Sequence, residues 1–192
     1  MSNPNTAGEQ ALEIDLRDPA LAGFLAWLWP GLGHFYQRRH AKGMLFMVCI
    51  LGTYFFGLTL GEGKVVYANW TQEDHRWQYA LQLGVGLPAA PAIVQAIAAK
   101  RPEGPIGGYF MAPPKPSPRG GNIHDAGQIA NTLPEWHKRL NVRFELGTLY
   151  TMVAGLLNIL AIYDALAGPA LSEPVDEKKR PPGEGDDKKK QS

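Results

Sequence analysis

Four long stretches of this 192-residue chain contain no Asp, Glu, Lys or Arg. They cover residues 19–37, 43–61, 77–99 and 146–163. A helix needs roughly 20 residues to cross the hydrocarbon core of a bilayer, so each stretch is long enough or nearly so. The mean hydropathy is only −0.20, because charged residues concentrate outside these stretches. The pattern predicts an all-α integral membrane bundle with three to four transmembrane helices.

The second and fourth stretches are the clearest candidates for transmembrane helices. They read GMLFMVCILGTYFFGLTLG and LGTLYTMVAGLLNILAIY, and they are apolar on every side. A helix on the surface of a soluble protein keeps one polar face, so these sequences favour a bilayer. The alternative is a soluble helical bundle with a very apolar core, which needs amphipathic helices to face water. Only residues 125–145 have that pattern.

The first and third stretches are less regular. Pro30-Gly31 interrupts the first stretch, which therefore either crosses the membrane or enters it and returns. The third contains three glutamines and two prolines, Pro88 and Pro91. Prolines are tolerated in a membrane helix where neighbouring groups bond to the carbonyls that they leave free. We expect the third stretch to be a transmembrane helix.

Together these features predict seven segments. The charged, proline-containing composition after the fourth stretch favours disorder. The N-terminal residues lack the basic region of a secretory signal, so we expect no cleavable signal peptide. The segments are a polar tail (1–18), a helical hairpin (19–61), an external loop (62–76), a third transmembrane helix (77–99), a Pro/Gly-rich cytoplasmic loop with an amphipathic helix (100–145), a fourth transmembrane helix (146–168) and a disordered tail (169–192).

The basic residues predict an orientation, because lysine and arginine near helix ends prefer the cytoplasmic side. Residues 38–42 hold three basic residues and residues 100–145 hold seven, whereas residues 62–76 hold two bases against three acids. This pattern places the first and third loops in the cytoplasm and the second loop outside. With four spans, both termini lie outside. The expected location is a bacterial inner membrane.

The third loop contains two candidate contact segments. Six prolines and five glycines in residues 100–122 oppose regular structure. Within them, Tyr109, Phe110 and Met111 form an apolar cluster that could dock on the membrane or on a protein partner. Apolar residues then recur at spacings of three and four between 129 and 144, which predicts an amphipathic helix. Its Trp136, Lys138 and Arg139 are candidate contacts to lipid or to a partner.

Few residues suggest catalysis or metal binding. The single cysteine, Cys49, excludes an internal disulfide framework, and the five histidines have no metal-ligand spacing. We therefore expect no metal and no cofactor. Asp164 is the only acid close to an apolar core, and it either faces water or pairs with His34 or Arg38. Asn158 is placed for a hydrogen bond between helices.

The turn between the first two stretches, AWLWPGLGHFYQRRHAKGMLF, resembles the signature of the TM-two domain family. There an apolar helix ends in a Gly-x-Gly-x-His-x-Phe-Tyr-like turn, and a glycine starts the next helix. Gln37-Arg38-Arg39 departs from the family's turn motif, and the Tyr163-Asp164 ending comes about a hundred residues late. The resemblance covers residues 20–61 and 150–168, and it implies a membrane hairpin without implying an activity. The matching turn positions are Pro30, Gly31, Gly33, His34, Phe35, Tyr36 and Gly43.

Three functions fit these patterns. The leading hypothesis is a non-enzymatic scaffold that binds a protein partner or anionic lipid through its basic loops, with Arg38, Arg39 and Lys42 each contributing about 1 kcal/mol at an anionic surface. Alternatively, these residues only set the orientation of the chain in the membrane and bind no ligand. The second hypothesis is a small transporter or channel subunit that works as a homo-oligomer. The third, a membrane enzyme, needs His34, Asp164 and another polar group to converge. A net charge of +1 gives no reason to expect nucleic acid.

Overall fold

The computed structural model describes residues 18–71, 74–117 and 129–167. These residues form helices and connecting segments without a β-strand, and the β-bridges among them are two isolated ones, Trp70 with His75 and Lys115 with Thr132. The predicted all-helical fold is therefore confirmed for the described part of the chain. The predicted tails lie outside the described residues except for Asp18, as do residues 118–128 of the predicted third loop.

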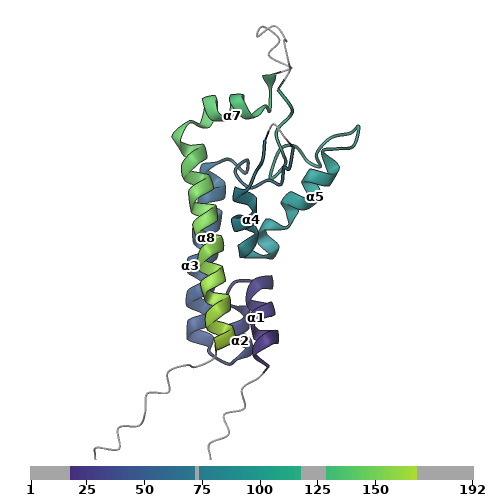
Figure 1. Cartoon of the computed structure of the whole chain (residues 1–192). Helices are drawn as coiled ribbons and strands as arrows, with labels where there is room; N and C mark the ends of the chain where they lie inside the picture. Colours follow the sequence, from purple (N-terminus) through teal and green to yellow (C-terminus); the bar gives the residue numbers. More distant parts are fainter. Residues whose placement is uncertain (1–17, 72–73, 118–128, 168–192) are drawn as a thin grey trace, which may run out of the picture.

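Two long helices, α3 (His40–Leu60) and α8 (Val142–Ala167), form the central pair of the molecule (Figure 1). At 1.5 Å per residue they are about 32 and 39 Å long, and both are long and apolar enough to cross a membrane. They cross closely at two glycines: a Cβ on Gly57 would lie 2.8 Å from the carbonyl oxygen of Gly147. The lower end of the pair is the end where α3 begins and α8 ends, and the upper end is the opposite one.

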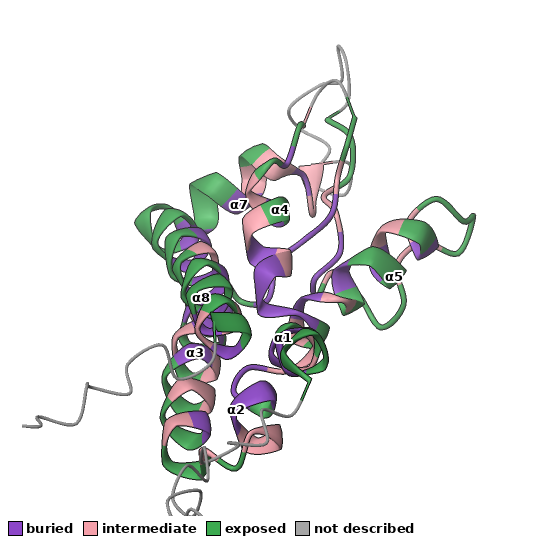
Figure 2. Cartoon of the chain, turned by 60° about the horizontal axis from the view of Figure 1, so that its bottom comes forward, coloured by how far each residue is buried: buried purple, intermediate pink, exposed green. Residues whose placement is uncertain are grey.

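The outward faces of α3 and α8 are apolar and exposed. Only 28% of the most apolar part of α3 and 39% of that of α8 are buried within the chain, whereas the core helix of a soluble protein is mostly buried. Figure 2 shows exposed residues along both helices. The two helices therefore need an apolar environment that the described chain does not supply. Their large exposed side chains include Leu45, Val48, Phe56, Leu149 and Leu160.

The first apolar stretch turns back on itself. Helix α1 (Pro19–Leu28) is capped by the Asp18 side chain and runs upward for about 15 Å. Gly31 then reverses the chain at φ +86°, a backbone conformation that favours glycine. Helix α2 (Leu32–Tyr36) returns to the lower end. The stretch is therefore a helical hairpin, which is the shape that the second of the two predicted alternatives requires.

The third apolar stretch is also a hairpin, so the predicted continuous third transmembrane helix is wrong. Helix α4 (Gln78–Gln82) and the 3₁₀ turn η1 (Leu83–Val85) run down from the upper end. Gly86, at φ +87°, reverses the chain. A second 3₁₀ turn, η2 (Leu87–Ala89), and helix α5 (Pro91–Ala98) then lead upward and away from α8 (Figure 1).

Two tyrosines bond to the carbonyls that this break leaves free. The Tyr54 hydroxyl donates to the Pro88 carbonyl at 3.0 Å, and the Tyr79 hydroxyl donates to the Ala89 carbonyl at 2.9 Å. These bonds satisfy the condition under which prolines are tolerated in a membrane segment. The result is an interrupted helix, because Gly86 reverses the chain and Pro88 and Pro91, which follow it, remove two backbone donors.

The second and third loops lie together at the upper end. Arg139 of α7 (Leu133–Leu140) contacts the Glu62 carboxylate at 2.6 Å, and the Met111 amide donates to the Gly63 carbonyl at 2.7 Å. Residues in contact cannot lie on opposite sides of a membrane. The prediction that the second loop is external while the third is cytoplasmic is therefore wrong, because both loops lie at the same end. The physical reason is the third stretch, which reverses at Gly86 and leads back toward the upper end.

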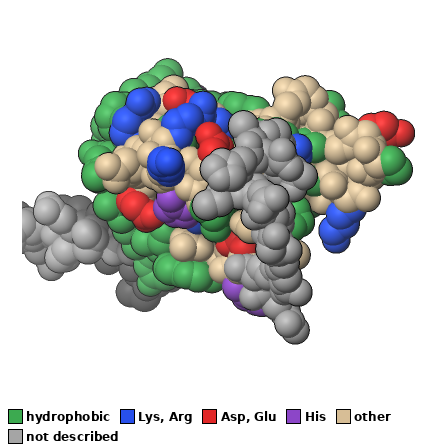
Figure 3. Space-filling view, turned by 90° about the horizontal axis from the view of Figure 1, so that it is seen from above, with side chains coloured by type: hydrophobic (Ala, Val, Ile, Leu, Met, Phe, Trp, Pro, Cys, Tyr) green, Lys and Arg blue, Asp and Glu red, His purple; other side chains and the backbone are tan. Residues whose placement is uncertain are grey.

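The upper end is a folded cap over the central pair. Residues 65–68 are buried beneath α7, in the same core as Trp136 and Phe144. The outer surface of the cap carries acidic and basic side chains intermixed, as the view from above shows (Figure 3). Mixed charge of this kind gives the cap a solvated surface without a strong field of one sign.

Candidate functional site

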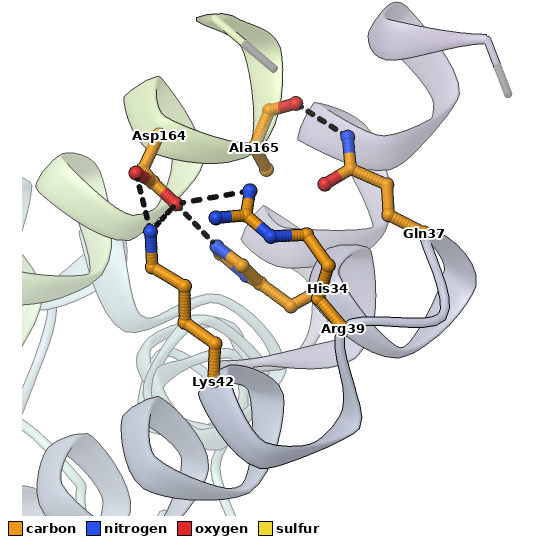
Figure 4. A network of polar contacts seen from close by, with 6 residues as sticks. All are labelled: His34, Gln37, Arg39, Lys42, Asp164 and Ala165. Atoms are coloured by element: carbon orange, nitrogen blue, oxygen red, sulfur yellow. Dashed lines mark hydrogen bonds and ion pairs between the residues drawn. The ribbon is translucent and has the colours of Figure 1, made fainter. Parts of the chain in front are cut away.

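Four polar side chains meet at the lower end, and we call them the lower-end cluster: His34, Arg39, Lys42 and Asp164 (Figure 4). His34 comes from α2, Arg39 precedes α3, Lys42 is in the first turn of α3, and Asp164 is in the last turn of α8. The connection from α2 into α3 therefore places three donors around one carboxylate that is 122 or more residues away in sequence.

The Asp164 carboxylate is the common acceptor of the cluster. Its Oδ2 accepts from His34 Nε2 at 2.7 Å, and Lys42 Nζ donates to Oδ1 at 2.7 Å. Arg39 Nη1 lies 3.7 Å from Oδ2, which is ion-pair range without a hydrogen bond. Of the two partners considered from the sequence, Asp164 pairs with His34. Its arginine neighbour is Arg39, whereas the sequence suggested Arg38.

His34 is fully buried although it is a polar residue. Its ring lies 4.9 Å from the Phe46 ring, centroid to centroid. Burial lowers the pKa of His34 below 6.5, and the hydrogen bond to Asp164 only partly opposes this effect. We therefore assign the neutral imidazole at pH 7, with Nε2–H donated to Asp164.

The other ring nitrogen limits what His34 can do chemically. Nδ1 is buried and has no hydrogen-bond partner among the described residues. A general base must reach the proton that it removes, within about 3 Å or through one water. The three groups that a membrane enzyme would need are brought together here, but the free nitrogen is enclosed by protein. The arrangement is suited to holding α2 against α8.

The predicted turn motif explains how α1, α2 and α3 pack so closely. A Cβ on Gly33 would collide with the Ala22 carbonyl, and a Cβ on Gly31 would collide with the Gly43 carbonyl. Gln37, next to the motif, donates from Nε2 to the Ala165 carbonyl at 2.7 Å. The glycines allow backbone contact between the short helices, and Gln37 adds a second tie to α8.

The remaining predicted contact residues lie elsewhere. Lys138 and Arg139 are exposed at the upper end, and Phe110 is also exposed there. Met111 is 2% exposed and Trp136 is fully buried, so the prediction that they dock on lipid or on a partner is wrong. Both pack in the core of the cap, because the loop folds back onto residues 63–68. The structure does not bring the two predicted basic surfaces together.

A second buried polar network, of which only Asn158 was predicted from the sequence, follows the inner face of α8. Arg76, only 6% exposed, donates from Nη2 to the Val65 carbonyl and to the Thr148 hydroxyl. Its guanidinium lies 4.5 Å from the centre of the Tyr67 ring. No sequence signal marks this arginine, because it stands in a charged loop next to Asp74 and His75.

Two polar side chains of the apolar stretches continue this network. Gln82 donates from Nε2 to the Thr151 hydroxyl at 2.8 Å and to the Val65 carbonyl at 3.1 Å. Asn158 donates from Nδ2 to the Ala26 carbonyl at 3.1 Å and to the Gly84 carbonyl at 2.9 Å. Asn158 thereby joins the tips of both hairpins to the middle of α8.

Within the described residues there is no group of three or more His, Cys, Asp or Glu side chains that could hold a metal ion. In the comparisons with known proteins, residues 21–179 match the model of a protein family described as a family of unknown function (DUF6677). No curated protein and no solved structure matches the chain.

Proposed function

The chain belongs to DUF6677, and from that premise we propose a non-enzymatic integral membrane protein that binds anionic lipid headgroups at its lower end. Membrane residence is supported by the apolar, exposed faces of α3 and α8. A bilayer would cover these faces, which the described chain leaves open. A cell membrane is the proposed location, and a bacterial inner membrane stays a prediction.

The spanning part of the proposal has two transmembrane helices, α3 and α8, in place of three or four. Each hairpin reaches about halfway, since α1 is about 15 Å long and the hydrocarbon core is about 30 Å thick. The two hairpins enter from opposite ends and meet at Asn158. Their irregular backbone is mostly buried, with Pro30, Val85 and Gly86 enclosed by protein, as the absence of water in a bilayer requires.

Headgroup binding is carried by one observation: Arg38, Arg39 and Lys42 lie where α3 begins, at the level where headgroups would lie. Arg38 is exposed, and the side chains of Arg39 and Lys42 are 31% and 34% exposed. Asp164 compensates part of this charge, and the rest is open to a phosphate. Each arginine should contribute about 1 kcal/mol, decreasing with salt.

The test measures binding of a short-chain phosphatidylglycerol to the purified chain in detergent. Arg38→Ala with Arg39→Ala should weaken binding by about 2 kcal/mol, which is roughly 30-fold at low salt. The matched control, Lys138→Ala with Arg139→Ala, removes the same charge from the upper end and should leave the affinity unchanged. Equal affinity of all three proteins would overturn headgroup binding at the lower end.

The resemblance to the TM-two domain family is part of this proposal. It is supported by the close packing of Gly31, Gly33 and Gly43, and by the contact of Asp164 with His34. The Tyr163-Asp164 ending comes late in the sequence, but α8 brings it back beside the turn. Under this proposal the turn and the ending therefore form one structural unit.

A small transporter or channel subunit, working as a homo-oligomer, is the second candidate. The meeting of two half-length hairpins near the middle of α8 favours it, because membrane transporters place their binding sites at such interrupted helices. Both Gln82 and Gln95 bond to protein groups, so neither is free to line a wet path in this conformation. Ion flux into vesicles that contain the chain would separate this candidate from the first.

A further inference from the structure

The junction of the two hairpins brings two helix C-termini face to face. Helix α1 ends two residues after Ala26, and η1 ends one residue after Gly84. The carbonyls of both residues accept from the same nitrogen, Asn158 Nδ2. Aligned peptide dipoles give a helix C-terminus a partial negative charge, up to about half a unit in a full helix. Two such ends repel each other unless a positive group lies between them.

The returning arms of the hairpins supply few donors to this junction. Pro30 lies just before the reversal of the first hairpin and Pro88 just after that of the second, and neither has a backbone N–H. Gly86 approaches so closely that a Cβ there would collide with the Trp27 carbonyl. Acceptors therefore outnumber donors where the two tips meet.

Asn158 itself carries an unused acceptor. The residue is fully buried, and its Oδ1 has no hydrogen-bond partner among the described residues. A buried oxygen without a donor is unfavourable, so a further ligand would be stabilising there. Charged side chains are distant along α8: Thr148, the contact of Arg76, is about 15 Å away, and Asp164 is about 9 Å away.

We propose that this junction binds a monovalent alkali cation. In the structure Nδ2 of Asn158 donates to the Ala26 and Gly84 carbonyls. The amide oxygen and nitrogen are nearly equal in size, so a half-turn of the amide would give up these two hydrogen bonds and direct Oδ1 at the carbonyls, with the ion replacing the N–H groups as their partner. Three oxygens would then surround the ion, in the way that interrupted membrane helices bind Na⁺ at their C-terminal ends. Any role of this cation in ion flux rests on the transporter candidate. Binding of the cation itself is testable without a measurement of flux.

The experiment compares the melting temperature of the full chain in detergent in NaCl, KCl and choline chloride at equal ionic strength. Choline is too large to fit between the three oxygens, so it controls for general salt effects. We expect a saturable increase in melting temperature with Na⁺ or K⁺ over choline. Asn158→Asp keeps the shape and adds a negative charge, and it should lower the half-saturating cation concentration at least tenfold.

The matched control is Gln95→Glu, which makes the same amide-to-carboxylate change at a buried amide far from the junction. It should leave the cation dependence as in the wild type. Equal melting temperatures in all three salts for the wild type and for Asn158→Asp would overturn the cation site. Phosphatidylglycerol binding at the lower end would be unaffected by that outcome, so the two proposals fail separately.

Discussion

At the scale of single residues, the position of Asp164 explains the lower-end cluster. It accepts from His34 and Lys42 and attracts Arg39, so one carboxylate compensates several donors in a confined space. A buried histidine that stays neutral needs such a fixed acceptor to define which nitrogen carries the proton. The cluster therefore couples the fit of α2 against α8 to the protonation of His34.

This coupling predicts a pH dependence of stability. The folded-state pKa of His34 lies below the unfolded value of 6.5, so the unfolded chain binds the proton more readily. Stability from this residue is fully present above pH 6.5 and is lost as the pH falls through the lowered folded pKa. We expect the melting temperature in detergent to decrease as the pH falls below 6.5.

Two histidine variants test whether His34 is the cause. His34→Gln removes the titrating ring and should flatten the profile in this range, since a glutamine amide can still donate to Asp164. His40→Gln changes an exposed histidine six residues further on and should keep the wild-type profile. A slope that disappears in His40→Gln and persists in His34→Gln would contradict the assignment.

Residue pairing was the hardest feature to predict from the sequence. Asp164 and His34 are 130 residues apart, and only their shared position beside apolar stretches suggested a contact. Arg76 had no such signal, because a buried guanidinium and a solvated one look alike in a charged loop. The membrane-length helices were predictable, because length and composition alone define them.

At the scale of elements, the two hairpins differ from transmembrane helices in their turns and hardly at all in composition. A stretch without charges is equally compatible with a straight helix and with one that reverses. Pro30-Gly31 indicated a possible reversal in the first stretch, whereas we took Pro88 in the third as tolerated in a transmembrane helix. The decisive positions are Gly31 and Gly86, whose positive φ values follow from tertiary contacts that the sequence does not contain.

Gly86 should therefore be essential for the second hairpin. Its φ is +87°, and a Cβ would collide with the Trp27 carbonyl at the tip of the first hairpin. Gly86→Ala should destabilise the fold by roughly 2–4 kcal/mol, through backbone strain and lost packing. Denaturant titration of the purified chain in mixed micelles measures this loss.

Gly104 provides a matched control for the part of the loss that comes from backbone strain. It has a similar φ of +78°, and a Cβ at this position would meet no atom within 4 Å. Gly104→Ala should cost only about 1 kcal/mol, from the strained backbone alone. Equal losses for both variants would show that the contact between the hairpin tips contributes nothing to stability.

At the scale of the whole molecule, two long helices and two half-length hairpins place the described ends of the chain together. Asp18 and the end of α8 both lie at the lower end, and the second and third loops form the upper cap (Figure 1). The orientation inferred from basic residues loses its basis, because the first and third loops lie at opposite ends. The positive-inside rule also weakens for loops longer than about 60 residues, and the upper segment is longer than that.

The proposed two-span topology and the four-span topology predicted from the sequence give opposite results for thiol accessibility in intact cells. In a Cys49→Ala background, single cysteines would replace His40 at the lower end, Trp70 in the second loop and Lys138 in α7. The two-span arrangement predicts that positions 70 and 138 react with a membrane-impermeant maleimide from the same side and position 40 from the other. The four-span arrangement predicts that 40 and 138 react together, because the third stretch would then cross. Matching reactivity of 40 and 138, opposite to 70, would therefore exclude the returning hairpin, and with it the face-to-face helix ends at Asn158.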